Sequence, residues 1–322
     1  MLFWMELCFV LFLPSDTQGS SQSNVTSIFL LGFHDTGKFT VLLFIFLLLI
    51  FCGTLCGNLL IITLVSISKT LHSPMYFFLT QLSITDLMLS TNISPNMLNI
   101  VLHSNTSIPF FDCVTQYYFF CFSEGSECFL LMAMSYDRYV AICHPLHYVS
   151  IITPGLCTTL VVLAWLLSFI VTTAVTFYIC QLQFCGPNTI DHFYCDVIPL
   201  IELSCSDVSS MKMDIALMGI PVVILPFLAI LVSYMGIVWT ILKISSISGR
   251  QKCFSTCSSH LTVVCLFYWS IIAIYIIPNE DHSQMGSKIM SMLYTVFTPL
   301  LNPCIYSLRN EDIKNALKNV VV

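Results

Sequence analysis

Three consecutive residues, Asp137, Arg138 and Tyr139, end a long apolar stretch of the sequence, within MAMSYDRYVAICHPLHY at 132–148. They place an acid, an arginine and a tyrosine where an apolar helix should leave the membrane. Alone, Arg138 would be explained as a residue that extends its charged end to the membrane surface. The acid and the tyrosine beside it favour a conformational switch.

Two more acids lie deep within apolar stretches, at a similar depth. Glu127 precedes Arg138 by 11 residues, which in a helix is almost three turns and about 16 Å. Asp86 follows Pro74, a candidate first-turn proline, by 12 residues, or about 18 Å. A charge at mid-membrane costs about 2.5 kcal/mol or more, which favours pairing, protonation or a bound cation. With Asn302 the two carboxyls form a candidate sodium or water site; the alternative is protonated carboxyls hydrogen-bonded inside the bundle, without a regulatory role.

A ligand site between helices requires a cavity with a few polar groups in apolar surroundings. Counted from the inner ends of their helices at Arg138 and Lys252, Glu124 lies about 21 Å deep and Tyr268 about 24 Å deep, so both fall in the outer half of the membrane. Helical spacing places further side chains on the same faces. The predicted ligand site comprises Phe120, Cys121, Glu124, Tyr268, Ile271, Ile272 and Tyr275.

The charge of Glu124 leaves three interpretations open. An ionised Glu124 would favour a cationic amine. A protonated one would donate a hydrogen bond to an aldehyde, ketone or alcohol. Glu124 also lies one helical turn from Glu127 and could belong to the ion site instead.

Apolar helices must hold these side chains at their depths. Of the 322 residues, 57% are hydrophobic and 9% are charged, which excludes an ordinary soluble protein. Seven apolar stretches of roughly 20 residues or more can cross a hydrocarbon core as helices. The sequence predicts an all-α membrane protein, a seven-transmembrane helix bundle over 39–308, with a short C-terminal amphipathic helix in the cytoplasmic segment 309–322. The predicted spans are about 39–66, 76–101, 114–142, 156–179, 213–242, 254–277 and 286–307.

The basic residues predict the orientation, because short cytoplasmic loops hold more Lys and Arg than short outer loops. With the N-terminus outside, only Lys38, Lys212 and Lys288 of the 11 basic residues lie outside. The loop acids then face outward, and the net charge of -6 reflects an acidic outer surface. Nothing in this pattern indicates nucleic acid, whereas the basic inner edge suits anionic membrane lipid.

Residues 1–38 are predicted to form an extracellular N-terminal tail. The segment LCFVLFLP at 7–14 is similar to the apolar core of a signal peptide that would end near Gly19, yet no Lys or Arg precedes it. An uncleaved tail, or Met5 as the true start, are the alternatives. Asn24, in Asn24-Val25-Thr26, is a candidate glycosylation site.

Most of the 16 cysteines lie within apolar spans, where cysteine packs as a small hydrophobic residue. Five lie on the predicted outer side, where they can oxidise. Because five is an odd number, at least one stays free, and the sequence alone does not fix the pairing. These residues are Cys113, Cys180, Cys185, Cys195 and Cys205.

Several longer motifs follow one another along the chain. They are Gly57-Asn58, LHSPMYFFLTQLSITDL at 71–87, MSYDRYVAICHPLHY at 134–148, FCGPNTIDHFYCD at 184–196, Ser233-Tyr234, KCFSTCSSHLTVV at 252–264 and PLLNPCIYSLRN at 299–310. In this order they resemble the vertebrate odorant receptors, a group of the rhodopsin-like G protein-coupled receptors, from the first span to the C-terminus.

This resemblance implies roles for individual residues. Arg138 would be held by acidic and polar neighbours at rest and would point toward a G protein in the active state. The partners of Asp137, Arg138 and Tyr139 in this switch would be Tyr234, Asn302, Pro303 and Tyr306. The resemblance also implies two disulfides, Cys113–Cys195 and Cys185–Cys205, which leave Cys180 over and make the outer loop a lid.

The resemblance further implies a small volatile odorant as ligand and a stimulatory G protein of olfactory neurons as partner, raising cyclic AMP. The chain would then be a multi-pass plasma-membrane receptor and no metabolic enzyme, with no cofactor beyond the candidate sodium ion. A receptor of this family acting outside the olfactory epithelium is an alternative. A transporter is less favoured, because the chain shows no internal repeats or paired broken helices.

Three residues depart from the family's usual pattern. Glu124 stands where a small or neutral residue is usual, Trp269 follows Tyr268 in place of a glycine, and Cys253 replaces an alanine. Trp269 either fills the cavity or turns toward lipid. These departures weaken any inference of the ligand from relatives.

Overall fold

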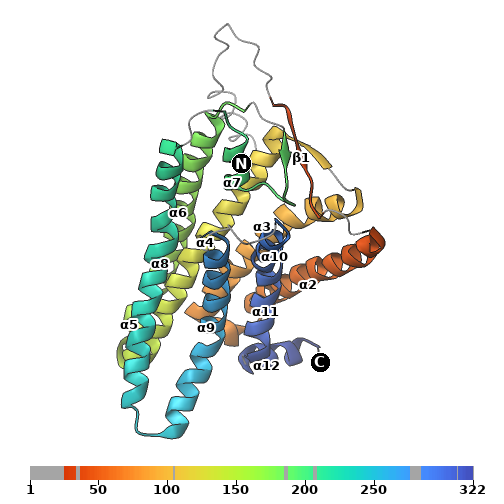
Figure 1. Cartoon of the computed structure of the whole chain (residues 1–322). Coiled ribbons are helices and arrows are strands. Elements are labelled where there is room, and N and C mark those ends of the chain that lie inside the picture. The colour runs from red at the N-terminus through yellow and green to blue at the C-terminus, as the bar shows by residue number, and fades with distance from the viewer. Residues whose placement is uncertain are drawn as a thin grey trace.

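The computed structural model describes residues 25–33, 37–103, 106–184, 188–205, 209–275, 284–309 and 311–321. Within these ranges seven long helical spans form a bundle (Figure 1). Six are single helices, and the seventh consists of two helices joined by a π-helical turn. The spans are α2 (Thr40–Ile67), α3 (Pro74–His103), α4 (Phe110–Cys143), α6 (Pro154–Cys180), α8 (Ser209–Lys243), α9 (Ile247–Tyr275), and α10 (Gln284–Met292) with η4 (Leu293–Phe297) and α11 (Thr298–Arg309).

The predicted seven-helix bundle is confirmed, and local signals explain several helix ends. Pro74 is the first residue of α3, as predicted. Proline suits this position because an N–H there would have no partner within the helix. Thr153 caps α6 by accepting a hydrogen bond from the Leu156 N–H at 3.2 Å. The sixth span was predicted to begin near 254, but α9 begins at Ile247. Its first turns are polar and extend beyond the apolar stretch, so hydrophobicity does not reveal them.

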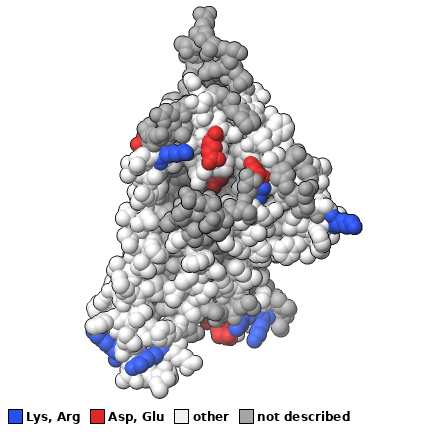
Figure 2. All heavy atoms as spheres, in the orientation of Figure 1, with Lys and Arg blue, Asp and Glu red and all other residues white. Residues whose placement is uncertain are grey.

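The surface between the two ends of the bundle is apolar. In Figure 2 the coloured charged atoms gather toward the two ends of this face, and white atoms cover the surface between them. Among the described residues, four segments are long and apolar enough to cross a membrane by length and composition alone, namely Gly37–Ile67, Pro154–Cys180, Lys212–Lys243 and Met285–Ser307. The other three spans, α3, α4 and α9, carry more polar side chains and lie within the same bundle.

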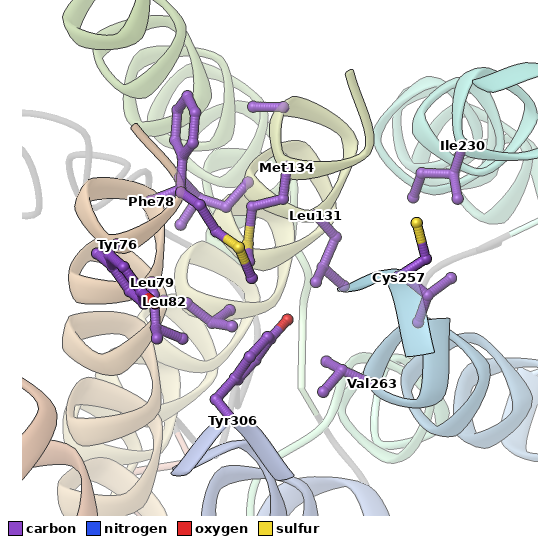
Figure 3. Close-up of a cluster of buried hydrophobic side chains, with 14 of the residues drawn as sticks. Tyr76, Phe78, Leu79, Leu82, Leu131, Met134, Ile230, Cys257, Val263 and Tyr306 are labelled. Atoms are coloured by element: carbon purple, nitrogen blue, oxygen red, sulfur yellow. The ribbon is translucent and has the colours of Figure 1, made fainter. Parts of the chain in front are cut away.

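Helix α4 occupies the centre, where it contacts α3, α6, α8 and α9. The inner half of the bundle contains the largest cluster of buried apolar side chains. Figure 3 shows Tyr306 of α11 at the middle of this cluster, between Leu82 of α3 and Val263 of α9. Tyr306 is fully buried, so that the aromatic side chain joins three spans in one core.

A small sheet at the outer end was not predicted. β1 (Ser27–Leu30) pairs antiparallel with β2 (Thr106–Pro109) and parallel with β3 (Thr189–Ile190). Ile28 and Leu30 point inward and are fully buried. Strands of two to four residues are too short to give a recognisable alternating pattern, which is why the sequence indicated only helices. The N-terminal strand is thereby fixed to the short first outer connection and to the long second one.

Short elements complete the two ends. α7 (Val197–Glu202) lies in the second outer loop, and η1 (Gly37–Phe39) precedes α2. At the inner end lie η2 (Lys69–Leu71), η3 (Pro145–His147), α5 (Tyr148–Ile151) and the C-terminal helix α12 (Glu311–Val321). Helix α12 is amphipathic, because it buries Ile313 and Ala316 and exposes Glu311. The Tyr76 hydroxyl donates a hydrogen bond to Asp312 Oδ2 at 3.0 Å, which ties α12 to α3.

Candidate functional site

The inner end of α4 holds an ion pair between neighbouring residues. Arg138 Nη2 lies 3.0 Å from Asp137 Oδ2, and the Tyr148 hydroxyl donates a hydrogen bond to Asp137 Oδ1 at 2.7 Å. Asp137 is buried, with 1% of its side chain exposed. The arginine is therefore paired within its own helix, and the tyrosine of α5 holds the acid of that pair.

A second polar chain connects three helices just above this ion pair. The Tyr234 hydroxyl of α8 lies 2.7 Å from His260 Nδ1 of α9, and His260 Nε2 lies 3.2 Å from the Leu131 carbonyl oxygen of α4. A neutral imidazole can accept at one nitrogen and donate at the other, so the hydroxyl donates to Nδ1 and Nε2–H donates to the carbonyl. His260 was absent from the predicted site, although a fully buried histidine in an apolar helix was the available signal.

Three more of the predicted switch residues lie around these pairs. Tyr139 packs against Gly236 of α8, where an added Cβ would come within 2.6 Å of its ring. Pro303 packs against Gly57 of α2, where a Cβ would lie 3.1 Å from Pro303 Cγ. The Tyr306 hydroxyl is buried and has no hydrogen-bond partner among the described residues. The structure thus brings these side chains into one region without joining Tyr306 to Tyr234 by a hydrogen bond.

The structure brings the two mid-membrane acids, Asp86 and Glu127, together with Asn302. Asn302 Nδ2 donates to Asp86 Oδ1 and Oδ2 at 3.1 and 3.2 Å and to Glu127 Oε1 at 3.3 Å. All three residues are at most 2% exposed. Asn302 Oδ1 has no partner among the described residues. The oxygens of two carboxyls and one amide suit a hard cation, once the amide turns its oxygen toward the carboxyls.

A cavity of about 180 Å³ lies in the outer half of the bundle between α4, α6, α8 and α9. Its wall is largely apolar, with Val171 and Val175 of α6 and Ile215 and Val222 of α8 among the side chains. Glu124 of α4 lines it, and neither of its carboxylate oxygens has a hydrogen-bond partner among the described residues.

The second outer loop covers the bundle and is fixed to α4. Cys113 and Cys195 form a disulfide with 5.5 Å between their Cα atoms. The Cys195 N–H donates to Gln116 Oε1 at 3.0 Å, and Gln116 Nε2 donates to the Asn92 carbonyl oxygen at 3.2 Å. The ring of Tyr194 packs on Phe120, with 5.1 Å between ring centroids. Because Phe120 also lines the cavity, the loop forms its roof.

Lys288 of α10 fixes this loop to the N-terminal segment. Its ammonium group donates to the Gly32 carbonyl oxygen at 2.7 Å and forms an ion pair with Asp191. Gly32 has φ +61, and a Cβ there would overlap Ile100, so glycine suits this position. Burial, and then the charge of Lys288, lower the pKa of the neighbouring His192 to about 3.

A sequence profile described as "Olfactory receptor" matches residues 44–322. The chain belongs to the olfactory receptor family. It is 45% identical to olfactory receptor 1468 of Rattus norvegicus over 94% of this chain and 96% of that protein, and 48% identical to olfactory receptor 1F1 of Homo sapiens over 94% and 97%. As a member of this family it is a multi-pass receptor of the plasma membrane and not an enzyme.

The fold of this olfactory receptor is similar to that of a solved receptor. Squid rhodopsin superimposes with a TM-score of 0.68 at 18% identity, covering 87% of this chain and 84% of that one. At this identity the likeness shows the fold alone. It supports the seven-span assignment for α3, α4 and α9, whose composition is less apolar than that of the other spans.

Some predicted ligand residues of the olfactory receptor line the cavity and others do not. Phe120, Cys121, Glu124 and Ile271 line it. Tyr268 does not, because its ring packs on Phe227 of α8, with 4.7 Å between centroids. Ile272 is also absent from the wall, since it lies 100° around the helix from Ile271. The side chain of Tyr275 lies outside the described parts of the chain.

Sequence reasoning missed the walls that α6 and α8 contribute. It placed the site between α4 and α9, whereas α8 packs closely along α4 and brings its own side chains to the cavity. Ser168 and Thr172, four residues apart in a largely apolar helix, were the available signal, because small polar residues mark helix interfaces in membranes. The missed lining residues are Tyr117, Gly125, Cys128, Ser168, Val171, Thr172, Val175, Ile215, Gly219, Val222, Val223 and Tyr294.

The remaining predictions fall on the outer surface. Cys205 is disulfide-bonded, while its expected partner Cys185 lies outside the described residues. So do Asn24 and the signal-like segment 1–19. Cys180 is a free cysteine. Trp269 is 69% exposed on α9, so of the two alternatives it turns away from the bundle and leaves the cavity open.

Proposed function

We propose that this olfactory receptor binds small volatile odorants in the cavity between α4, α6, α8 and α9 and activates a stimulatory G protein of the olfactory type, which raises cyclic AMP. One observation carries the proposal: α4 lines the cavity with Phe120 and Glu124 and ends in the Asp137–Arg138 ion pair. A ligand that shifts α4 against α8 therefore acts on the same rigid element that holds the arginine.

The cavity limits the ligand. An engineered apolar cavity of about 150 Å³ binds benzene, so a cavity of about 180 Å³ accommodates a molecule of about one six-membered ring with a short substituent. The apolar wall contributes about 25 cal/mol for each Å² of ligand surface that it removes from water. A molecule of this size has few polar atoms, so we expect modest affinity and recognition by shape together with one polar contact.

The proposed path from ligand to G protein runs through the polar chain of α8, α9 and α4. Tyr234, His260 and the Leu131 carbonyl hold the inner halves of these helices together. When α9 moves away from α4, His260 loses its contact to Leu131, and the Tyr234 hydroxyl becomes available to Arg138. The arginine then exchanges Asp137 for the tyrosine and the G protein.

Three further assignments belong to this proposal. The N-terminus is extracellular, supported by the pairing of β1 with the loops that the Cys113–Cys195 disulfide fixes. A sodium ion binds Asp86, Glu127 and Asn302 in the resting receptor. Basic residues such as Lys314 and Lys318 on α12 contact anionic lipid at the inner surface.

A cyclic AMP reporter in cells that express an olfactory-type G protein tests the proposal. Small volatile molecules should raise cyclic AMP in cells with the wild-type receptor. Arg138→Ala should lose the response while its surface expression, measured with an antibody on intact cells, stays equal. The proposal would be contradicted if Arg138→Ala gave the full cyclic AMP response to a ligand. It would also be contradicted if the wild-type receptor signalled only through a different G protein.

A further inference from the structure

Among the described residues, Glu124 differs from the buried acids Asp86, Glu127 and Asp137 in having no hydrogen-bond or ion-pair partner. Asp86 and Glu127 share the amide of Asn302, and Asp137 binds Arg138 and Tyr148. In the described parts of the chain, both oxygens of Glu124 are buried without a hydrogen bond. A buried carboxyl without a partner is costly in either protonation state, so the site is incomplete without a further group.

The position of Glu124 shows where that group must come from. The Asn302 amide reaches Asp86 and Glu127 but not Glu124, which argues against the alternative that Glu124 belongs to the ion site. Glu124 instead lines the cavity. The missing partner is therefore a polar atom of the molecule that occupies the cavity.

We propose that this receptor is selective for small basic amines, whose nitrogen binds the Glu124 carboxyl while the hydrocarbon body fills the cavity. This inference rests on the ligand site proposed above. An amine is suited to both forms of the carboxyl. If Glu124 is a carboxylate, it accepts hydrogen bonds from an ammonium group. If Glu124 is a carboxylic acid, it gives its proton to a neutral amine. The O–H bond then breaks, an N–H bond forms, and the same ion pair results.

Other odorant classes match the site less well. An aldehyde or ketone only accepts hydrogen bonds and so pairs with the protonated acid alone. An alcohol pairs with either form but leaves a carboxylate without a counter-charge in a largely apolar cavity. Only an amine combines hydrogen bonding with charge neutralisation, and charge-assisted hydrogen bonds are the stronger kind.

Acids near the mouth of the cavity do not offer an equivalent site. Asp196 accepts a hydrogen bond from the Val197 N–H at 2.7 Å as the cap of α7. Asp191 forms the ion pair with Lys288. Asp214 lies on the exposed face of α8, one residue before the cavity-lining Ile215. It therefore supplies a matched control that removes one outer carboxylate without altering the wall.

The test measures binding without the G protein. The full-length receptor in lipid nanodiscs is titrated with cyclohexylmethylamine, cyclohexylmethanol and methylcyclohexane, which share one skeleton, and binding is followed by the rise in melting temperature. The amine should bind at least about tenfold more tightly than the alcohol. Glu124→Gln should abolish this preference, Glu124→Asp should retain it, and Asp214→Asn should leave it unchanged.

Two outcomes would overturn the inference. One is equal or tighter binding of the alcohol to the wild-type receptor, and the other is an amine preference that persists in Glu124→Gln. The melting temperature without ligand shows whether each variant is folded. Because no G protein takes part, amine binding with no cyclic AMP response would refute the coupling proposal and leave this inference standing.

Discussion

His192 shows how one buried side chain makes the outer loop sensitive to pH. Its side chain is 8% exposed and lies near Lys288, so that protonation would place a second positive charge in a site that already holds one. Burial, and then the charge of Lys288, lower its pKa from 6.5 to about 3. Between these values the unfolded chain binds a proton that the folded receptor does not, and the free energy of unfolding decreases as the pH falls.

We expect the receptor to lose about 1 kcal/mol of stability between pH 7.5 and pH 5.5 through His192, since each pH unit below 6.5 contributes at most about 1.4 kcal/mol. The measurement is the melting temperature of the purified receptor across this range. His192→Gln keeps a polar side chain of similar reach but does not titrate, and its melting curve should shift less over the same range. An equal shift in both proteins would show that other groups cause it.

Tyr148 is the residue that connects the inner loop to the switch. Its hydroxyl donates to the buried Asp137 carboxylate, and a hydrogen bond to a charged group contributes about 1.5–3 kcal/mol. Tyr148→Phe keeps the ring and removes this bond. Because the bond holds the arrangement in which Arg138 stays on its own helix, we expect basal cyclic AMP to rise, by about tenfold or more. Receptor number on the surface is the normalising measurement. Unchanged basal signalling at equal expression would exclude this role.

At the scale of helices, the cavity depends on residues that lack a side chain. Gly219 of α8 lines it, and an added Cβ would meet no atom within 4 Å, whereas at Gly125 it would lie 3.2 Å from Ser168 Oγ. Gly219→Ala therefore adds a methyl group to empty space within the wall. It should also strengthen α8 by up to about 1 kcal/mol, since alanine favours the helix more than glycine does.

We expect Gly219→Ala to weaken the response to the largest agonists by roughly tenfold, because overfilling a packed site costs about 1–3 kcal/mol, and to spare smaller ones. Concentration–response curves for a series of ligands that differ by one methylene group measure this change. Gly155→Ala, at the first turn of α6 and far from the cavity, is the matched control. If both variants shifted all ligands equally, the cavity would not be the binding site.

The sequence predicted the helices better than it predicted which of their side chains form the walls of the cavity. Apolar length gave the seven spans, and counting 1.5 Å per residue correctly brought Asp86 and Glu127 to one level, because depth depends on a single helix. Which helix faces which depends on long-range packing. The contact of Tyr268 with Phe227 and the α8 wall of the cavity could not be derived from either helix alone. The three short strands were missed because their pairing joins residues far apart in the chain.

At the scale of the whole molecule, α4 connects the two functional ends. The Cys113–Cys195 disulfide fixes its outer end, Glu124 and the cavity lie along its length, and Asp137 and Arg138 end it. The charged ends and the apolar surface between them (Figure 2) set this axis across the membrane. Under the proposed function, a signal would cross the bilayer by the movement of α8 and α9 relative to α4.

The arrangement of the bundle also predicts which of its two ends faces the outside of the cell. β1 begins at Ser27 and pairs with β2 and β3 beside the disulfide, and disulfides form in oxidising compartments. Asn24 precedes this strand by three residues, so it should carry a glycan. We expect a glycosidase that removes N-linked glycans to lower the apparent mass of the receptor, and Asn24→Gln to abolish that change. A tag at the C-terminus should bind antibody only after permeabilisation. If antibody reached that tag on intact cells, the predicted orientation of the receptor in the membrane would be wrong. The disulfide and the basic inner edge lie at opposite ends of one bundle, so both assignments would be wrong together.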